Sequence, residues 1–142
     1  MLECENPESR EGNVQGTILI AEDHDDVRNL TKMMVEMLGH KVIEAADGFE
    51  ALEAARKHRP DLILMDIAMP VMNGVVASKL IRETRACRTT PIVAVTAYSS
   101  EYLYNADSVT FDKVLEKPVE LTDIEQVIEE FLTEEKVSEI VN

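Results

Sequence analysis

The chain has 142 residues, a size that suits one folded domain with its own hydrophobic core. Its 28 acidic residues outnumber 14 basic ones, and the formal net charge of −14 would repel nucleic-acid phosphates and anionic membrane surfaces. Two cysteines support neither a disulfide framework nor a thiolate metal site. No apolar run reaches the length of a membrane span, and acidic residues stand where a signal peptide would need basic and apolar ones, so we expect a cytoplasmic protein.

The first elements follow from composition and hydrophobic period. Residues 1–16 are polar and acidic, which predicts a disordered tail. The apolar, β-rich run at 17–21 predicts a strand that stops at a cluster of acidic residues. A helix capped by Asp25 and ended by Gly39 is predicted next. Its inner face is marked by apolar residues three and four apart: Val27, Leu30, Met34 and Leu38.

Strands and helices continue to alternate along the rest of the chain. Short apolar or β-rich runs predict strands at 42–45, 62–65, 91–96 and 113–116. Helices are predicted at 49–59, around inward-facing Val76, Leu80 and Ile81, weakly at 99–108, and at 121–132. The last helix has Thr122 or Asp123 as its cap, and its phase nearly continues through an acidic extension at 133–142. This alternation predicts an α/β domain at 17–132, with a doubly wound, five-stranded parallel sheet and about five helices.

Chemically active side chains follow four of the predicted strands, and parallel strands end at one edge of a sheet. These side chains belong to Glu22 and Asp23, Asp66, Thr96 and Lys117. Three converging carboxylates repel one another and need a cation to stay ionised. A divalent ion with oxygen ligands, Mg²⁺ above all, meets this need and suits phosphoryl transfer to Asp66 as the nucleophile. Lys117 and Thr96 would then contact phosphoryl oxygens.

Each of these residues also has an ordinary structural explanation. Glu22 and Asp23 suit a solvated helix start, and Asp66 suits a cap of the following loop. Neighbouring His24 suits a solvated loop position better than a metal ligand, because the oxygens beside it favour hard ions. Their coincidence at one edge favours a functional site. No glycine-rich phosphate motif follows any strand, which argues against dinucleotide and P-loop sites.

The motifs at these strand ends resemble the receiver domain of two-component response regulators. The matching segments are Ile18–Asp23, Leu64–Pro70, Met72–Gly74, Val95–Ala97 and Leu115–Pro118. Their separations also fit, with 43 residues from Asp23 to Asp66 and 30 from Asp66 to Thr96. The resemblance covers about residues 17–131 and implies the flavodoxin-like strand order 2-1-3-4-5.

The resemblance also implies roles for individual residues. Asp66 is expected to accept a phosphoryl group from a sensor histidine kinase or a histidine phosphotransfer protein, while Thr96 and Lys117 match the switch hydroxyl and the phosphate-binding lysine. Four residues match the magnesium ligands of the family: Glu22, Asp23, Asp66 and, through its backbone carbonyl, Ala68.

The sequence departs from the family where a tyrosine or phenylalanine usually acts as the rotating switch, because Val114 stands there. We expect the segment with Tyr98, Tyr102 and Tyr104 to sense Thr96 instead. We also expect Tyr98 to shield the phosphate and slow its loss. The predicted switch and partner surface comprises Thr96, Ala97, Tyr98, Tyr102, Val114 and Pro118.

We favour a function as a stand-alone phosphorelay regulator that acts on a downstream output protein. We expect it not to be an enzyme and to contact neither nucleic acid nor membrane. Val114 keeps open a degenerate receiver that binds partners without phosphate. An aspartate-nucleophile phosphohydrolase is the less favoured alternative, because it needs a second acid two residues after Asp66, where Ala68 stands.

Overall fold

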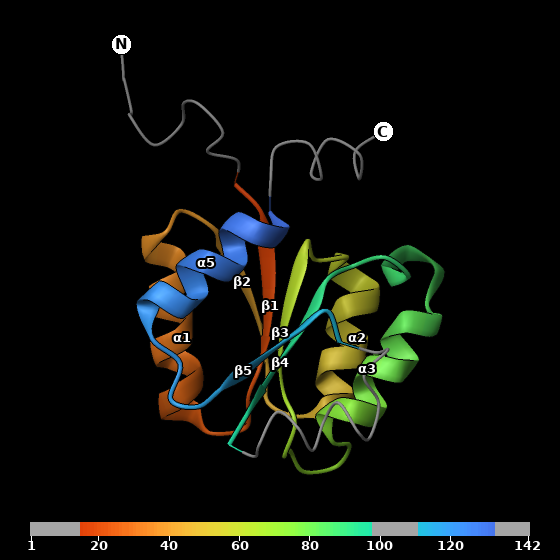
Figure 1. Cartoon of the computed structure of the whole chain (residues 1–142). Helices are drawn as coiled ribbons and strands as arrows, with labels where there is room; N and C mark the ends of the chain where they lie inside the picture. The colour runs from red at the N-terminus through yellow and green to blue at the C-terminus, as the bar shows by residue number, and fades with distance from the viewer. Residues whose placement is uncertain (1–14, 98–110, 133–142) are drawn as a thin grey trace.

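The computed structural model describes residues 15–97 and 111–132 (Figure 1). The elements along the chain are β1 (Thr17–Ala21), α1 (Asp25–Met37), β2 (Lys41–Ala45), α2 (Gly48–His58), β3 (Leu62–Asp66), α3 (Gly74–Glu83), the 3-10 turn η2 (Arg85–Cys87), β4 (Ile92–Thr96), β5 (Lys113–Glu116) and α5 (Leu121–Phe131). The strands pair in parallel in the order β2-β1-β3-β4-β5, which confirms the predicted doubly wound sheet and its implied order.

The described residues contain four α-helices, against about five expected. The weak helix predicted at 99–108 lies outside the described residues, as do most of the two predicted tails. In the part of the chain that is described, every helix is too short or too polar to cross a lipid bilayer.

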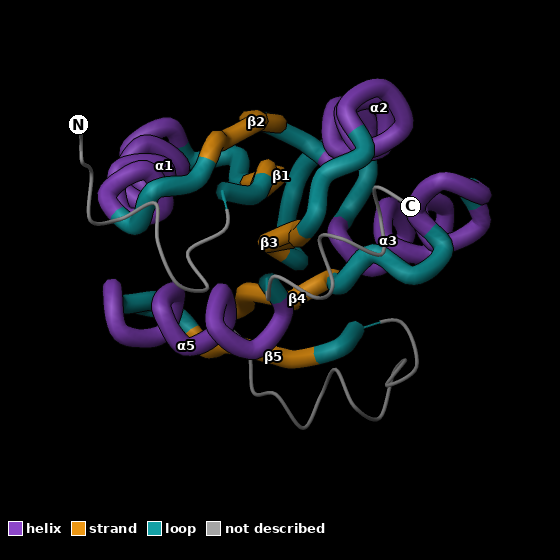
Figure 2. Tube along the Cα trace, turned by 90° about the horizontal axis from the view of Figure 1, so that it is seen from above, coloured by secondary structure: helices purple, strands orange, loops and turns teal. Residues whose placement is uncertain are grey.

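Helices cover both faces of the sheet because successive residues of each buried strand point to opposite sides. Ile18 and Ile20 of β1 belong to a buried cluster shared with α1 and α5, whereas Leu19 and Ala21 belong to a second cluster shared with α2 and α3. Figure 2 shows α1 and α5 on one side of the sheet and α2 and α3 on the other. The central strand β3 is buried along its whole length, which fixes the position of Asp66 at its end.

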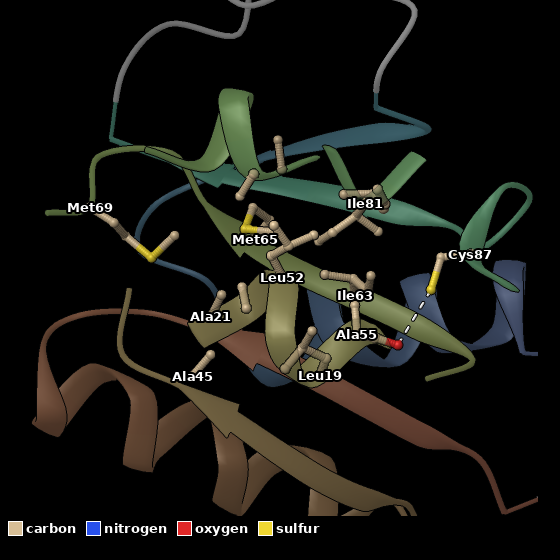
Figure 3. Close-up of a cluster of buried hydrophobic side chains, with 14 of the residues drawn as sticks. Leu19, Ala21, Ala45, Leu52, Ala55, Ile63, Met65, Met69, Ile81 and Cys87 are labelled. Carbon is tan, nitrogen blue, oxygen red and sulfur yellow. Dashed lines mark hydrogen bonds between the residues drawn. The ribbon is translucent and has the colours of Figure 1, made fainter. Parts of the chain in front are cut away.

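The cluster on the α2 and α3 side is packed from small and branched side chains (Figure 3). Ile63 of β3 is fully buried and contributes with Leu52 and Ile81 to this core. Burying one such side chain stabilises the fold by about 1.5–3 kcal/mol. Cys87 is also buried here, and its thiol lies 3.5 Å from the carbonyl oxygen of Ala55, so it packs as a small core residue.

The inner faces of two helices differ from the prediction. In α1, Val27 and Leu30 are 41% and 56% exposed, and the residues buried against the sheet are Met34 and its neighbour Val35. In α3, Val76 is 43% exposed. The N-terminal half of α1 therefore leaves space between itself and the sheet, whereas its C-terminal half seals the core.

Two helix starts also differ from the prediction. Asp25 is the first residue of α1 rather than its cap, and its carboxylate accepts a hydrogen bond from Arg28 at 2.7 Å. The N-cap of α5 is Glu120 rather than Thr122 or Asp123. Asp123 still stabilises this start, because its carboxylate accepts the backbone N–H of Glu120 at 2.9 Å.

Candidate functional site

Two acidic residues leave the sheet side by side at its carboxyl edge. Strands β1 and β3 pair in register up to Ala21 and Met65, so Glu22 and Asp66 are the next residues of adjacent strands. Both are only 4% exposed. The site therefore begins with two carboxylates that the fold removes from water.

Lys117 brings one positive charge to these carboxylates from the end of β5. Its backbone N–H donates to the carbonyl oxygen of Thr96 at 2.8 Å, which ties it to the end of β4. Its Nζ lies 2.9 Å from Oε1 of Glu22 and 3.4 Å from Oδ1 of Asp66. The structure thus brings together three residues that the sequence assigned to one site, from strands far apart in the chain.

The pKa shifts of these groups follow from burial and from their shared charges. Burial and the charge of Glu22 raise the pKa of Asp66 to about 6, although Lys117 acts against this. Burial also opposes ionisation of Glu22, but hydrogen bonds from Lys117 and His24 lower its pKa. The pKa of Lys117 is raised, because its hydrogen bond to Glu22 and the charge of Asp66 outweigh burial. Asp66 is therefore the carboxylate whose charge is compensated least.

The donors at this edge fit a divalent cation. Ligand atoms of Glu22, Asp23 and His24 lie within 4.8 Å of one another. Oδ1 of Asp23 is buried and has no hydrogen-bond partner among the described residues. His24 is 71% exposed in its side chain, and its Nδ1 lies 3.1 Å from Oε2 of Glu22. Carboxylate oxygens with open coordination suit a hard ion such as Mg²⁺.

The loop between β3 and α3 folds back over Asp66. The N–H of Gly74 donates to the carbonyl oxygen of Ile67 at 2.8 Å. A Cβ atom on Gly74 would lie 2.1 Å from the carbonyl oxygen of Asp66, so only glycine fits at this close approach of two backbone segments. Ala68, which the sequence suggested as a carbonyl ligand, lies in this loop and is exposed.

The residues predicted for the switch lie in different environments. Thr96 is buried at the end of β4, whereas Ala97 and Pro118 are exposed beside the site. Val114 is half-buried and packs against the core on the α2 and α3 side. The two predicted switch tyrosines lie outside the described residues: Tyr98 and Tyr102.

Sequence reasoning missed Arg28, which lies one turn into α1. Its Nη1 donates to the main-chain oxygen of Glu22 at 2.8 Å. The only sequence signal was an arginine five residues after Asp23, and such an arginine more often lies on a solvated helix face. The tertiary fold alone shows that it reaches the site.

An apolar groove opens beside the charged residues, between α1 and the segment that joins β5 to α5. We call it the α1–α5 groove; its volume is about 400 Å³, and Glu22, Asp66 and Lys117 contribute to its lining. Its apolar walls include Val27, Leu30, Met34, Pro118, Val119 and Ile124. Exposed Met33 and Met37 lie on the same helix. Exposed apolar residues next to a polar site are typical of a surface that binds another molecule.

Comparisons with known proteins agree with this geometry. The family model described as the response regulator receiver domain matches residues 18–129. The chain is 39% identical over 83 residues to the polar-differentiation response regulator DivK of Brucella anthropi, covering 58% of this chain and 68% of DivK. It is 36% identical over 132 residues to the autoinducer 1 sensor kinase/phosphatase LuxN of Vibrio campbellii, covering 93% of this chain but only 15% of LuxN.

A solved structure shares the fold. The receiver domain of the sensor histidine kinase PA1611 from Pseudomonas aeruginosa, solved with a magnesium ion coordinated in its active site cleft, matches with a TM-score of 0.76 and 28% identity. The match covers 84% of this chain and 98% of that domain.

Proposed function

Because this chain belongs to the response regulator receiver domain family of two-component signalling, we propose that it accepts a phosphoryl group on Asp66 from a phosphohistidine of a partner kinase or phosphotransfer protein. The observation that carries the proposal is the placement of the buried Asp66 carboxylate 3.4 Å from the Lys117 ammonium, at the edge that also holds Glu22. Kinases that draw on ATP work in the cytoplasm, and we propose that location for this chain.

The transfer exchanges one bond at phosphorus for another. A carboxylate oxygen of Asp66 forms an O–P bond while the N–P bond of the donor breaks, and its electron pair returns to the imidazole nitrogen. A pKa of about 6 leaves Asp66 mostly ionised at neutral pH, so it has the lone pair that the reaction requires. Asp66 is thus both a nucleophile and a carboxylate whose neighbours oppose its charge.

The neighbouring residues would hold the charge of the transferring group. Lys117 already reaches both buried carboxylates, and its ammonium would donate to a phosphoryl oxygen. The hydroxyl of Thr96 would donate to another. A magnesium ion bound at this site would neutralise the crowded negative charge. We propose as its ligands the carboxylates of Glu22, Asp23 and Asp66 and the backbone carbonyl of Ala68. The buried Oδ1 of Asp23, which makes no hydrogen bond among the described residues and lies 3.5 Å from Nδ1 of His24, supports this assignment.

We propose that the phosphorylated form differs from the free form in its affinity for an output protein. The exposed residues Ala97 and Pro118 flank the site and would change their surroundings when Thr96 turns toward the phosphate. Val114 packs into the core in place of the usual rotating aromatic residue. A valine cannot swing between buried and exposed positions as an aromatic ring does, so the surface around Thr96 would carry the signal.

The α1–α5 groove is the proposed docking surface for the phosphohistidine donor. It opens beside Asp66 and Lys117, so a helix seated along α1 would deliver its phosphohistidine to the edge of the sheet. Val27 and Leu30 line this groove and remain partly exposed, as expected of residues that become buried in a complex.

A labelling experiment tests the phosphoacceptor. The protein is incubated with acetyl phosphate and Mg²⁺ and then weighed by mass spectrometry. We expect the gain of one phosphoryl group in the wild type and no gain in Asp66→Asn or in the presence of a chelator. Asp26→Asn is the matched control, because Asp26 is an exposed acid of α1, and it should label normally. Equal labelling of Asp66→Asn would contradict the assignment.

A second experiment tests the docking surface. Leu30→Glu places a charge in the α1–α5 groove, and we expect transfer from a phosphohistidine-bearing protein to slow about tenfold, the effect of losing one well-buried contact. Labelling by acetyl phosphate should be unchanged, because that donor needs no docking surface. Asn29→Glu adds the same charge to the neighbouring exposed position and should retain normal transfer. Equal slowing in both variants would exclude a specific role for the groove.

A further inference from the structure

The guanidinium of Arg28 joins three parts of the chain next to the candidate site. Nη1 donates to the main-chain oxygen of Glu22 at 2.8 Å, and Nε donates to Oε1 of Glu44 at 3.1 Å. Nη2 donates to Oδ1 of Asp25 at 2.7 Å. Only 16% of the Arg28 side chain is exposed. Because a different nitrogen meets each partner, the plane of the guanidinium is fixed, which a lysine could not reproduce.

The main chain of Glu22 is consequently held from two sides. Its N–H donates to the carbonyl oxygen of Ala45 at 3.0 Å, and its carbonyl oxygen accepts the bond from Arg28. Glu44, which holds Arg28, is the neighbour of Ala45 on β2. These bonds form a closed ring through the end of β1, the first turns of α1 and the edge strand β2.

The carbonyl that Arg28 holds belongs to the peptide unit between Glu22 and Asp23. A peptide unit is planar, so restraining its carbonyl oxygen restrains the Cα atoms of both residues. We propose that Arg28 is a positioning residue that sets the geometry of the Glu22–Asp23 pair for a divalent cation. This inference rests on the proposed function, because the cation is the magnesium ion of that site.

Positioning and simple charge effects predict opposite results when Arg28 is replaced. A guanidinium repels a nearby cation, so a residue acting only through its charge would weaken Mg²⁺ binding, and its removal would tighten it. A residue acting through the Glu22 carbonyl improves the ligand geometry, and its removal would weaken binding. The sign of the change therefore separates the two roles.

Mg²⁺ affinity is measured by isothermal titration calorimetry, since the chain has no tryptophan to report binding by fluorescence. For Arg28→Gln we expect the Kd to rise about tenfold, the lower end of the effect of removing a group that orients a metal ligand. Arg28→Lys keeps the charge but not the three-way contact, and its Kd should also rise, by a smaller factor.

Lys32→Gln is the matched control. Lys32 lies on the same helix, and its Nζ is 3.3 Å from Oε2 of the same Glu44. The substitution removes one positive charge and one ion pair of Glu44 while leaving the bond from Arg28 to Glu22 in place. Its Kd should match the wild type.

A kinetic readout separates positioning from a general loss of structure. In acetyl phosphate labelling, Arg28→Gln should need more Mg²⁺ for half-maximal rate, while the rate at saturating Mg²⁺ stays within about twofold of the wild type. If Arg28→Gln unfolds at the assay temperature, Arg28→Lys decides the case.

The outcomes distinguish this inference from the proposed function. A wild type that binds no Mg²⁺, or binds it as well after Asp23→Asn, overturns the proposed function and the inference with it. A wild type that binds Mg²⁺ at Asp23, with equal or tighter binding in both Arg28 variants, overturns the role of Arg28 alone. Equal weakening by Lys32→Gln would likewise overturn it.

Discussion

The two edges of the sheet use acidic side chains in opposite ways. At the amino edge, Oδ2 of Asp61 accepts the first N–H of β1 at 2.8 Å, and Oδ2 of Asp112 accepts the first N–H of β4 at 2.8 Å. At the carboxyl edge, Glu22 and Asp66 share a single ammonium group. Acids of the first kind complete the hydrogen bonding of the sheet, whereas acids of the second kind face one another.

This difference separates a carboxylate that stabilises the fold from one that prepares a reaction. The main-chain N–H of Thr17 donates to Asp61, so this carboxylate contributes a hydrogen bond to the fold. Burial and the charge of Glu22 instead raise the pKa of Asp66, so its ionised form destabilises the empty site. A divalent cation would relieve this repulsion. Without one, the carboxyl edge is less stable than it would be if no reactive acid stood there.

The largest effects on stability and on the labelling rate are expected for a glycine substitution at the carboxyl edge, which is compared with one at the amino edge. Gly74→Ala at the carboxyl edge would drive a methyl group into the Asp66 carbonyl, 2.1 Å away. Because both partners are backbone, we expect a loss of about 3 kcal/mol in the free energy of unfolding. Displacement of the loop should also slow labelling by acetyl phosphate about 100-fold. Urea denaturation and the labelling rate measure the two effects.

Gly39→Ala is the control at the amino edge. Gly39 has a φ of +93°, and among the described residues no atom outside its own chain neighbours lies within 4 Å of the place that an added methyl group would occupy, so we expect mainly backbone strain to oppose the substitution. We expect a loss of about 1 kcal/mol and unchanged labelling. A similar labelling defect in both variants would show that labelling reports stability rather than the site.

The second prediction concerns the repulsion between the buried carboxylates of Glu22 and Asp66. Asp66→Asn should raise the free energy of unfolding of the metal-free protein by about 3 kcal/mol at pH 7.5, following the rise in the pKa of Asp66 from 3.8 to about 6. The native state holds the Asp66 proton at pH values where the unfolded state has lost it, so the wild type loses stability as pH rises from about 4 to about 6. The gain in Asp66→Asn should therefore be absent at pH 4 and complete above pH 6. A less stable variant at pH 7.5 would contradict this repulsion.

The third prediction is the opposite sign at the amino edge. Asp61→Ala removes the acceptor of the first N–H of β1 and should lower the free energy of unfolding by about 1.5 kcal/mol. Asp26→Ala, which removes an exposed acid of α1, is the control. In denaturant unfolding, its free energy of unfolding should differ from that of the wild type by less than about 0.5 kcal/mol. If Asp61→Ala is as stable as the wild type, the acid at the amino edge does not stabilise the fold, and the proposed contrast with the carboxyl edge is wrong.

The sequence was sufficient for the features that depend on local pattern and topology. Short apolar or β-rich runs predicted the five strands of the described sheet. The central strands β1, β3 and β4 are mostly buried and mostly apolar, whereas the edge strands β2 and β5 also carry polar residues. The convergence of Glu22, Asp66 and Lys117 followed from one topological fact, that parallel strands end at a common edge. Neither inference required knowledge of side-chain contacts.

Features that depend on competing side-chain contacts were not predictable. Asp25 was expected to cap α1, but Arg28 binds its carboxylate instead. Val27 and Leu30 fit a helical stripe in the sequence, yet they remain partly exposed and border the α1–α5 groove. Hydrophobic period identifies a helix but not how closely each turn of it approaches the core.

The smallest expected effect is a pH dependence at the amino edge opposite to that of Asp66. Nδ1 of His40 accepts the N–H of Gly16 at 3.0 Å, a bond that only the neutral ring can make, and burial lowers the pKa of His40 despite the nearby charge of Asp61. The unfolded chain therefore takes up this proton first as pH falls, so stability due to His40 is present above about pH 6.5 and is lost on acidification through the lower native pKa.

This effect is measured in the Asp66→Asn background, where the opposing dependence of the carboxyl edge is absent. Between pH 7.5 and pH 5.5, the protein with His40 should lose more stability in urea denaturation than the one carrying His40→Asn, by at most about 1 kcal/mol, the net value of one hydrogen bond. Restoring Asp66 should reduce the loss, because its carboxyl group gains a proton in the native state over the same range. Identical pH dependence with and without His40 would mean that protonation of His40 does not contribute to the stability of the fold.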